Sequence, residues 1–362
     1  MQTTRLATTL AIAALLGGVC SSPIAIADAS VKTSSATTHA RAAGDAAAGK
    51  PREVIAWSQF TDLNFSAARI VVSGPHGRHV RVLTHSAEGI VDLDPQISPD
   101  GRWIAFERDY PDTSRVVLVG IHGHRQHALD LGCADPCLGD ASPTWAPDGQ
   151  HLLFSRALGP VGPDGNAASV ALWRTDLSGQ HLKRLSSPGI DGRFEDGGAQ
   201  FAPDGYMVIR RYSIRRDLPA LFRMRRDGTH AVRITPWSIS ADIFDLSPAS
   251  SGPTHNLAVF ETYGHAPAPD GISSAVAAVS AARKSDHRLR YLTSPTSLPV
   301  SNFNPTWSPN GRRVAFVRFK SVKSDPVIHG DIWTMRWNGA DRARVSRAKL
   351  FDFRPTWGRI PS

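Results

Sequence analysis

Ser98-Pro99-Asp100-Gly101 is followed by Trp103-Ile104-Ala105-Phe106, and this pairing of a tight turn with an apolar run decides the fold. Pro-Asp-Gly is typical of a turn, because Pro fixes its own φ angle and Gly tolerates positive φ. A short run of β-branched and aromatic residues after such a turn is typical of a strand. The segment therefore predicts a turn that leads into a buried strand.

The same turn and run recur along the chain. The later copies are Ala146-Pro147-Asp148-Gly149, Ala202-Pro203-Asp204-Gly205, the decayed Ser247-Pro248-Ala249-Ser250, and Ser308-Pro309-Asn310-Gly311. The intervals are 48, 56, 45 and 61 residues, which indicates an array of similar units with loop insertions. Two further Pro-Asp-Gly triplets, at residues 163–165 and 269–271, are out of phase and are predicted turns in inserted loops.

Each unit is predicted to contain four antiparallel strands. After the strand that follows the turn comes a third apolar segment, such as residues 115–121, which ends at a second turn around Gly123. The fourth segment has a repeated ending, seen in Arg81-Val82-Leu83-Thr84 and Val232-Arg233-Ile234-Thr235. Four antiparallel strands in about 40–50 residues are typical of a propeller blade.

The two ends of the chain predict how many blades there are. Residues 53–84 supply strands two to four of a blade but lack the first strand. The segment Arg354-Pro355-Thr356-Trp357-Gly358 matches the first-strand segment Pro143-Thr144-Trp145-Ala146. The C-terminal strand is therefore predicted to complete the N-terminal blade, which gives an all-β, six-bladed propeller over residues 53–362 and removes exposed sheet edges.

These repeats resemble the TolB-like propeller family, also described as WD40-like or PD40 repeats, in which Trp-Ser-Pro-Asp-Gly precedes an Ile-Ala-Phe strand. The resemblance covers residues 53–362. It implies a periplasmic propeller that works with other envelope proteins, as in the Tol–Pal system, where a separate α/β domain precedes the propeller. Similar propellers accompany peptidase domains in the prolyl oligopeptidase group, but the Gly-x-Ser-x-Gly motif of such enzymes is absent from this sequence.

The first residues are predicted to be an export signal. Arg5 supplies a positive start, residues 6–19 an apolar core, and Ala25-Ile26-Ala27 a cleavage site, so residues 1–27 form the predicted signal peptide. Cleavage before Cys20 with lipidation is the alternative, and the preceding Gly-Gly-Val fits that signal less well. We expect a periplasmic or secreted protein.

Residues 28–52 are rich in Ala, Ser, Thr and Gly and are predicted to be a flexible linker. The chain carries a formal net charge of +9, which favours anionic partners such as acidic polysaccharide, lipid headgroups or acidic protein surfaces. No long uncharged stretch follows residue 27, so no membrane span is expected. Nucleic acid is not an expected partner outside the cytoplasm, and a monomer is expected.

Cys133 and Cys137 are the two cysteines beyond residue 20, and they are expected to form a small disulfide in an oxidising compartment. Exposed, solvated side chains are the simplest interpretation of the histidine cluster at His122, His124 and His127, with metal binding as the alternative.

Acidic side chains occur six residues before the turn in most units, where the first strand begins. They are Asp92, Asp140, Asp196 and Asp352, with Asn302 at the same position and Asp242 beside Ala241. Because the first strand of a blade is innermost, these side chains are predicted to surround one mouth of the channel and to attract a cation such as Ca²⁺ or the basic end of a peptide. Glu195 and Asp94 are expected to add acceptors there, and Arg354 a competing positive charge. The alternative is that each Asp bonds loop backbone and braces neighbouring blades.

Arginine is dense in one part of the chain. The seven residues are Arg210, Arg211, Arg215, Arg216, Arg223, Arg225 and Arg226. They are either a basic patch for an anionic partner or a solvated strand face.

Two hypotheses about function follow. In the first, the protein is a non-catalytic scaffold that binds an envelope protein or peptide. In the second, the acidic ring supports a metal-assisted hydrolase or lyase. The sequence favours the first, because no nucleophile, base or complete metal-ligand set can be named, and no cofactor is expected other than a channel Ca²⁺.

Overall fold

The computed structural model describes residues 50–161, 167–187, 194–263, 274–281, 289–294, 300–320, 329–347 and 349–362. The predicted signal peptide, most of the predicted linker, Cys20 and the turns at 163–165 and 269–271 lie outside these residues. The described part is almost entirely β-structure, with one short 3₁₀ helix, η1 (Trp237–Ile239). None of its helices is long and apolar enough to cross a membrane.

The strands form four-stranded antiparallel groups, which we number units 1 to 6. Unit 1 contains β24 (Asp352–Ile360), β1 (Arg52–Phe60), β2 (Ala68–Ser73) and β3 (Arg81–Val82). Unit 2 contains β4 (Val91–Ile97), β5 (Trp103–Asp109), β6 (Ser114–Gly120) and β7 (His127–Ala128). Unit 3 contains β8 (Cys137–Trp145), β9 (His151–Val161), β10 (Ala167–Asp176) and β11 (Lys183–Arg184).

The second half of the chain repeats this order. Unit 4 contains β12 (Phe194–Phe201), β13 (Tyr206–Ser213), β14 (Leu218–Arg225) and β15 (Val232–Arg233). Unit 5 contains β16 (Ala241–Leu246), β17 (Leu257–Tyr263), β18 (Ser274–Ser280) and β19 (Arg290–Tyr291). Unit 6 contains β20 (Val300–Trp307), β21 (Arg313–Lys320), β22 (Gly330–Arg336) and β23 (Ala343–Arg344). The predicted strand order is therefore observed within each unit.

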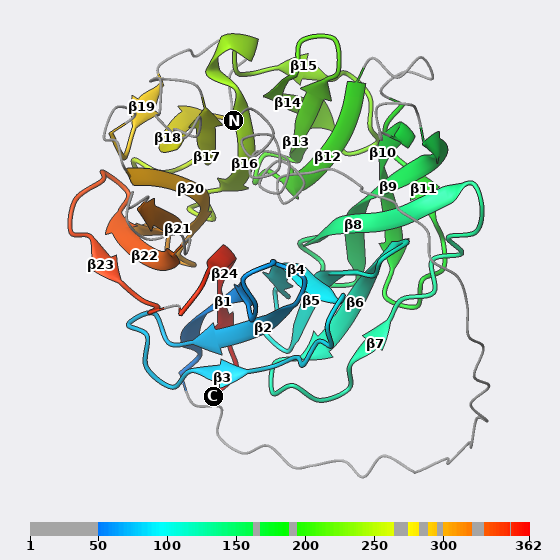
Figure 1. Ribbon diagram of the computed structural model, residues 1–362. Coiled ribbons are helices and arrows are strands. Elements are labelled where there is room, and N and C mark those ends of the chain that lie inside the picture. Colours follow the sequence, from blue (N-terminus) through cyan, green and yellow to red (C-terminus); the bar gives the residue numbers. More distant parts are fainter. Residues whose placement is uncertain are drawn as a thin grey trace, which may run out of the picture.

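The units lie around a common centre, with the first strand of each unit nearest to it and the short fourth strand outermost (Figure 1). Units 4, 5 and 6 are separate sheets, whereas units 1, 2 and 3 form one 12-stranded sheet. Single parallel pairs, Ala68 with Val91 and Ser114 with Gly139, join the units in this large sheet. The last strand, β24, pairs antiparallel with β1, from Arg52 opposite Ile360 to Gln59 opposite Asp352.

The apolar core lies between neighbouring units. Between units 1 and 2, for example, Ile70 from β2 packs with Ile104 and Phe106 from β5, and all three are fully buried. Burial of each such side chain contributes about 1.5–3 kcal/mol. A comparable cluster joins the last unit to the first, where Trp57 from β1 packs with Ile332 from β22. Unit 1 is therefore in apolar contact with both unit 2 and unit 6.

The turns between third and fourth strands also pack against the preceding unit. In unit 4, a Cβ atom on Gly228 would lie 1.5 Å from the Leu185 carbonyl oxygen of unit 3. In unit 1, a Cβ atom on Gly77 would lie 2.1 Å from the Val345 carbonyl oxygen of unit 6. Both glycines have positive φ angles, so the second Gly of the repeat allows a backbone approach between units that no other residue permits.

Candidate functional site

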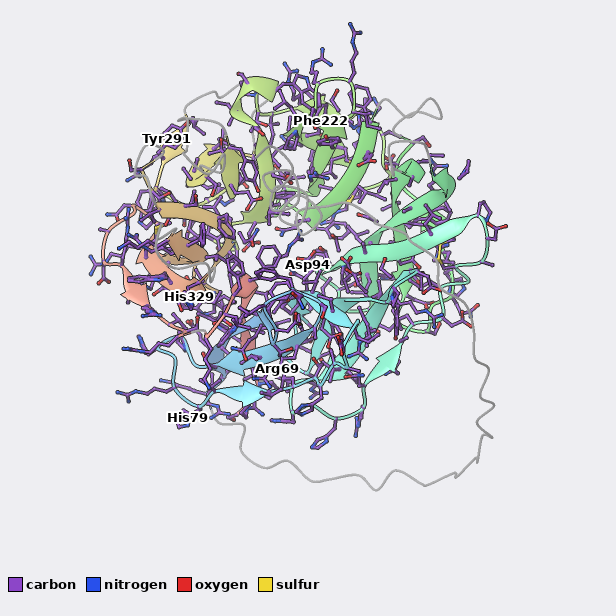
Figure 2. All side chains as sticks on the ribbon, viewed as in Figure 1. Arg69, His79, Asp94, Phe222, Tyr291 and His329 are labelled. Atoms are coloured by element: carbon purple, nitrogen blue, oxygen red, sulfur yellow. A yellow bond between two sulfur atoms is a disulfide. The ribbon has the colours of Figure 1, made fainter. Side chains whose placement is uncertain are left out.

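A cavity of about 330 Å³ is lined mainly by units 2, 3 and 4, with residues of β16 in unit 5 and β24 in unit 1. Asp94, which lines it, is near the centre of the ring in Figure 2. Five carboxyl groups and two guanidinium groups line the cavity: Asp94, Glu107, Asp109, Asp112 and Glu195, with Arg210 and Arg354. Negatively charged groups are therefore in excess when all are ionised.

An irregular pairing in the first strands turns certain residues toward this centre. The register of β4 against β5 shifts between Leu93 and Gln96, and Asp94 has a φ angle of 50°. Similar shifts occur in other first strands, where the residues with positive φ are Ser142, Gly198, Asn304 and Arg354. A β-bulge of this kind bends the strand and changes the direction of its side chains. Asp94, Ser142, Gly198 and Arg354 all line the cavity.

The cavity residues of the first strands therefore lie two positions after those predicted from the sequence. The prediction placed Asp92 at the channel mouth with Asp94 only as an added acceptor, whereas it is Asp94 that lines the cavity. Nothing in the repeat marks this position by residue type, because it is Asp, Ser, Gly, Asn and Arg in different units. The sequence marks these cavity residues only by their place in the repeat, because each of them lies two positions after the predicted residue.

Three of the predicted acidic residues pair with arginines on the neighbouring strand of their own unit. Asp140 and Arg156 are directly opposite each other on β8 and β9. The guanidinium donates from Nε at 2.7 Å and from Nη2 at 2.9 Å, and Asp140 is 2% exposed. The same bidentate geometry occurs for Asp92 with Arg108 and for Asp196 with Arg211.

Some of these carboxylates also join neighbouring units. Thr84, just after the fourth strand of unit 1, accepts the Ile70 N–H at 2.8 Å and donates to Asp92 Oδ2 of unit 2 at 2.5 Å. Ser86 donates to the same oxygen at 2.9 Å. At Asp92 the geometry thus matches the bracing interpretation of the acidic residues.

The other three predicted positions differ from this pattern. Asp242 forms an ion pair with Arg210 of unit 4, with Nε 2.5 Å from Oδ1. Asp352 is fully buried and accepts from Gln59 Nε2 at 3.0 Å, and burial raises its pKa to about 6. Asn302 is buried opposite Arg318. Cation binding by the six residues stays a prediction, and any cation would have to compete with the arginines for four of them.

Two glutamates that the sequence analysis missed hold the bulged backbone. Glu107 Oε2 on β5 accepts the N–H of Ser142 on β8 at 2.8 Å. Glu261 Oε2 on β17 accepts the N–H of Asn304 on β20 at 2.8 Å and its side-chain Nδ2 at 2.9 Å. In each case a carboxylate on the second strand of one unit binds the first strand of the next.

Burial raises the pKa of several carboxyl groups at this centre. Burial is the main cause at Glu107, whose pKa lies well above its ordinary value, and Asp109 and Asp94 add repulsion. Burial also raises the pKa of Asp109 to about 6. At Glu261, burial and the charge of Asp242 raise the pKa to about 7. Carboxyl groups with a pKa near neutrality can exchange protons at physiological pH or become ionised when a cation arrives.

Arg354 places a positive charge among the cavity carboxyl groups. Its guanidinium forms an ion pair with Asp94, and the Ser142 hydroxyl donates to the same carboxylate oxygen of Asp94 at 3.1 Å. Arg354 comes from β24, Asp94 from β4 and Ser142 from β8, so the first strands of units 1, 2 and 3 meet at the cavity. Attraction to Asp94 and Glu107 raises the pKa of Arg354, although burial opposes the shift.

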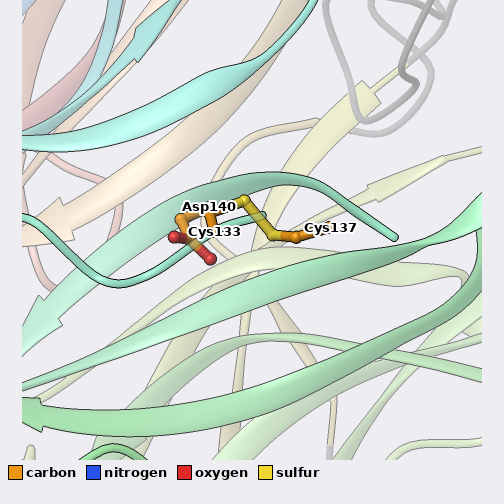
Figure 3. A group of neighbouring side chains, drawn as sticks. All are labelled: Cys133, Cys137 and Asp140. Carbon is orange, nitrogen blue, oxygen red and sulfur yellow. A yellow bond between two sulfur atoms is a disulfide. The ribbon is translucent and has the colours of Figure 1, made fainter. Parts of the chain in front are cut away.

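The predicted disulfide between Cys133 and Cys137 is present, with Cα atoms 5.2 Å apart. Asp140 lies beside it, and one ligand atom from each of the three residues fits within 4.8 Å (Figure 3). This is the one metal-like group among the described residues. Sulfur atoms in a disulfide are not thiolates, and Asp140 is bound to Arg156, so the group does not fit a metal ion. The histidines at 122, 124 and 127 are absent from it.

The seven arginines, interpreted from the sequence as either a basic patch or a solvated strand face, are divided between ion pairs near the interior and exposed positions. Arg210 and Arg211 form the interior ion pairs with Asp242 and Asp196. Arg223 lies over the Tyr206 ring and pairs with Asp204 at 2.7 Å. The exposed members are Arg215, Arg216, Arg225 and Arg226.

Comparison with solved structures shows what the architecture is similar to. TolB from Acinetobacter baumannii superposes with a TM-score of 0.61 at 19% identity, over 84% of this chain and 66% of that one. A TolB structure from Agrobacterium tumefaciens gives 0.55 at 16% identity, over 87% and 99%. The fold is that of a TolB-like β-propeller.

The same propeller fold also occurs in hydrazine synthase from Kuenenia stuttgartiensis, with a TM-score of 0.62 at 13% identity, over 87% of this chain and 47% of that one. No family model matches the sequence, and no curated protein matches it. At these identities the TolB-like propeller is established as a fold alone, and its function has to be argued from the central cavity.

Proposed function

We propose that this chain is an exported, closed six-bladed propeller that binds an envelope protein or peptide and catalyses no reaction. Two contacts support closure of the ring, the pairing of β24 with β1 and the apolar cluster between units 6 and 1. On this interpretation units 1 to 6 are the six blades. The signal-like residues 1–27 and the fold shared with TolB support a periplasmic or secreted location.

The binding site we propose is the central cavity, and its guest is a cationic group of the partner, such as a lysine or arginine side chain. The observation that carries this proposal is the excess of carboxyl groups over guanidiniums in a cavity of about 330 Å³. Carboxyl groups held together in a partly buried site repel one another when ionised. A guest cation relieves that repulsion, so binding is favoured.

A consequence is that binding releases protons. Burial raises the pKa of Asp109 to about 6, and a nearby cation lowers it toward the ordinary value. At pH 6, we therefore expect a lysine-containing peptide to bind with net proton release. Calorimetry in two buffers with different ionisation enthalpies measures this release directly, and the same peptide with acetylated lysines is the matched control. Equal heats for both peptides would contradict the proposal.

Calcium is a second cationic guest that the cavity carboxylates could hold. If Ca²⁺ occupies the site, it will compete with the lysine peptide and raise the melting temperature of the protein. A calcium effect without competition would place the ion outside the cavity. We propose a monomer as the binding species, because one ring contains the whole cavity.

The raised pKa of Glu107 and Asp109 favours one alternative function, a metal-assisted hydrolase or lyase. A carboxyl group with a pKa near neutrality in a cavity is suited to general acid–base chemistry. This alternative requires a tightly bound divalent ion and turnover that chelation abolishes. Metal analysis of the purified protein before and after chelation distinguishes it from the binding scaffold.

A further inference from the structure

Unit 4 and the neighbouring η1 carry a cluster of aromatic rings, none of which lines the cavity. Trp237 of η1 stacks on Phe194 of β12, with ring centroids 6.2 Å apart and an interplanar angle of 12°. Phe222 of β14 lies against the same indole at 5.7 Å. Phe222 is in unit 4, well away from the centrally placed Asp94 (Figure 2). Two strands of unit 4, β12 and β14, therefore hold Trp237 of η1 in position.

Two exposed arginines lie over this one ring. The guanidinium carbon of Arg216 is 5.5 Å from the centroid of a Trp237 ring, and that of Arg233 is 5.6 Å away. The two guanidinium carbons are therefore separated by at most about twice the distance from either one to the ring. The cation–π attraction stabilises each guanidinium, but it does not neutralise the charge. Among the described residues, neither side chain has a carboxylate partner.

Arg211 packs on rings of the same aromatic cluster, but its guanidinium is bound by a carboxylate. Arg211 lies over Phe194 at 5.7 Å and over Phe222 at 5.0 Å. Its guanidinium is bound by Asp196 at 2.6 and 2.8 Å. Arg216 and Arg233 share the aromatic support that Arg211 has, but they are exposed and face solvent. Their N–H groups are therefore available for a carboxylate from outside.

We propose that the Trp237 arginine pair, Arg216 and Arg233, is a docking site for an acidic segment of a protein partner. Stacked guanidiniums keep their N–H edges free and bind carboxylates in bidentate geometry. In an extended peptide, side chains two residues apart lie on one side and are separated by about 7 Å. Two acidic residues in an x-Asp/Glu-x-Asp/Glu pattern can then reach both guanidiniums.

Other anionic partners fit these observations less well. A lipid surface calls for exposed apolar side chains beside the basic ones. The large exposed hydrophobic residues of the described chain are Leu63, Val80, Leu182 and Tyr291, and none of them is in unit 4. A sugar ring would stack on Trp237, yet two phenylalanines and two guanidiniums already surround that indole. Recognition is therefore expected through guanidinium N–H groups.

The test is fluorescence anisotropy of a labelled decapeptide of alternating Glu and Ser with the full-length protein, beside a Gln-Ser peptide. The R216Q/R233Q variant is compared with R225Q/R226Q, which removes the same charge from exposed arginines of unit 4 that do not contact Trp237. We expect R216Q/R233Q to weaken binding of the acidic peptide by about tenfold or more, and R225Q/R226Q by less than about threefold.

Equal weakening in the two variants would overturn the proposal, as would failure of the wild-type protein to prefer the acidic peptide. Tighter binding of oligogalacturonate or of anionic lipid vesicles through the same two arginines would overturn the assignment to a protein partner. Circular dichroism melts of both variants confirm that folding is retained. The site is separate from the cavity, so binding of the lysine peptide should be unchanged in R216Q/R233Q.

Discussion

The N–H of Asn304 donates to Glu261 Oε2 at 2.8 Å, and this bond joins the bulged first strand of unit 6 to the second strand of unit 5. Asn304 has a φ angle of 47°, so the bulge removes its N–H from the regular ladder and a carboxylate from the neighbouring unit accepts it. Ser142 and Glu107 repeat the arrangement between units 3 and 2. Carboxyl groups near the centre therefore join neighbouring units, and Glu107 also lines the cavity.

This role makes folding stability depend on pH. The folded-state pKa of Glu261 is about 7, above its ordinary value of 4.5. Between these values the folded protein keeps a proton that the unfolded chain loses, so the contribution of Glu261 to stability falls as pH rises and levels off above pH 7. We expect the free energy of unfolding of the wild type to fall by about 1–3 kcal/mol relative to Glu261→Gln between pH 4.5 and 7.5.

Urea unfolding of both proteins at several pH values measures this difference. The comparison with Glu261→Gln cancels the effects of titrating groups that do not interact with Glu261, including Asp109. A constant difference across the range would contradict the raised pKa of Glu261.

The buried ion pair of Asp140 and Arg156 predicts a large effect of removing one partner. Asp140→Ala leaves a buried guanidinium without its carboxylate, and we expect it to lower the free energy of unfolding by about 3–5 kcal/mol. Replacing both residues, as Asp140→Leu with Arg156→Met, should recover most of that loss. Glu88→Ala, at an exposed position, is the control and should change stability by less than about 0.5 kcal/mol. If Asp140→Ala behaves like the control, Asp140 has no bracing role.

Closure of the ring is tested at Gly77, which touches unit 6. A Cβ atom there would lie 2.1 Å from the Val345 carbonyl oxygen, so Gly77→Ala forces units 1 and 6 apart. Gly205 is a matched control, because its φ angle is also positive and a Cβ atom would meet nothing within 4 Å. We expect a loss of about 3 kcal/mol or more for Gly77→Ala, but about 1–2 kcal/mol for Gly205→Ala. Equal losses in urea unfolding would argue against a tight contact between the first and last units.

Much of the architecture could be predicted because it depends on local chemistry that repeats. The Pro-Asp-Gly turns, the apolar runs and the C-terminal copy of a first strand specify the four-stranded units and the pairing of β24 with β1. The disulfide between Cys133 and Cys137 was equally accessible, because only three residues lie between the cysteines and the predicted export signal implies an oxidising compartment.

The candidate site could be predicted only in outline. Asp92 was expected at the channel mouth, with Asp94 only as an added acceptor, but a β-bulge places Asp94 in the cavity. A bulge of this kind depends on how two strands pair and leaves no fixed residue type in the sequence. The carboxylate of Glu107 was missed for a similar reason, since its partner Ser142 is 35 residues away on another unit. The alternative interpretation of the Asp residues as braces describes Asp92 well.

The central claim is that carboxyl groups of the cavity bind a cationic guest, and one titration tests it most directly. Binding of the lysine peptide is measured by calorimetry for the wild type, for Asp109→Asn with Glu195→Gln, and for Glu88→Gln with Asp148→Asn. The first variant neutralises two cavity carboxyl groups, whereas the second neutralises two exposed carboxyl groups elsewhere. We predict at least about tenfold weaker binding in the cavity variant alone. Equal affinities in the two variants would contradict the account.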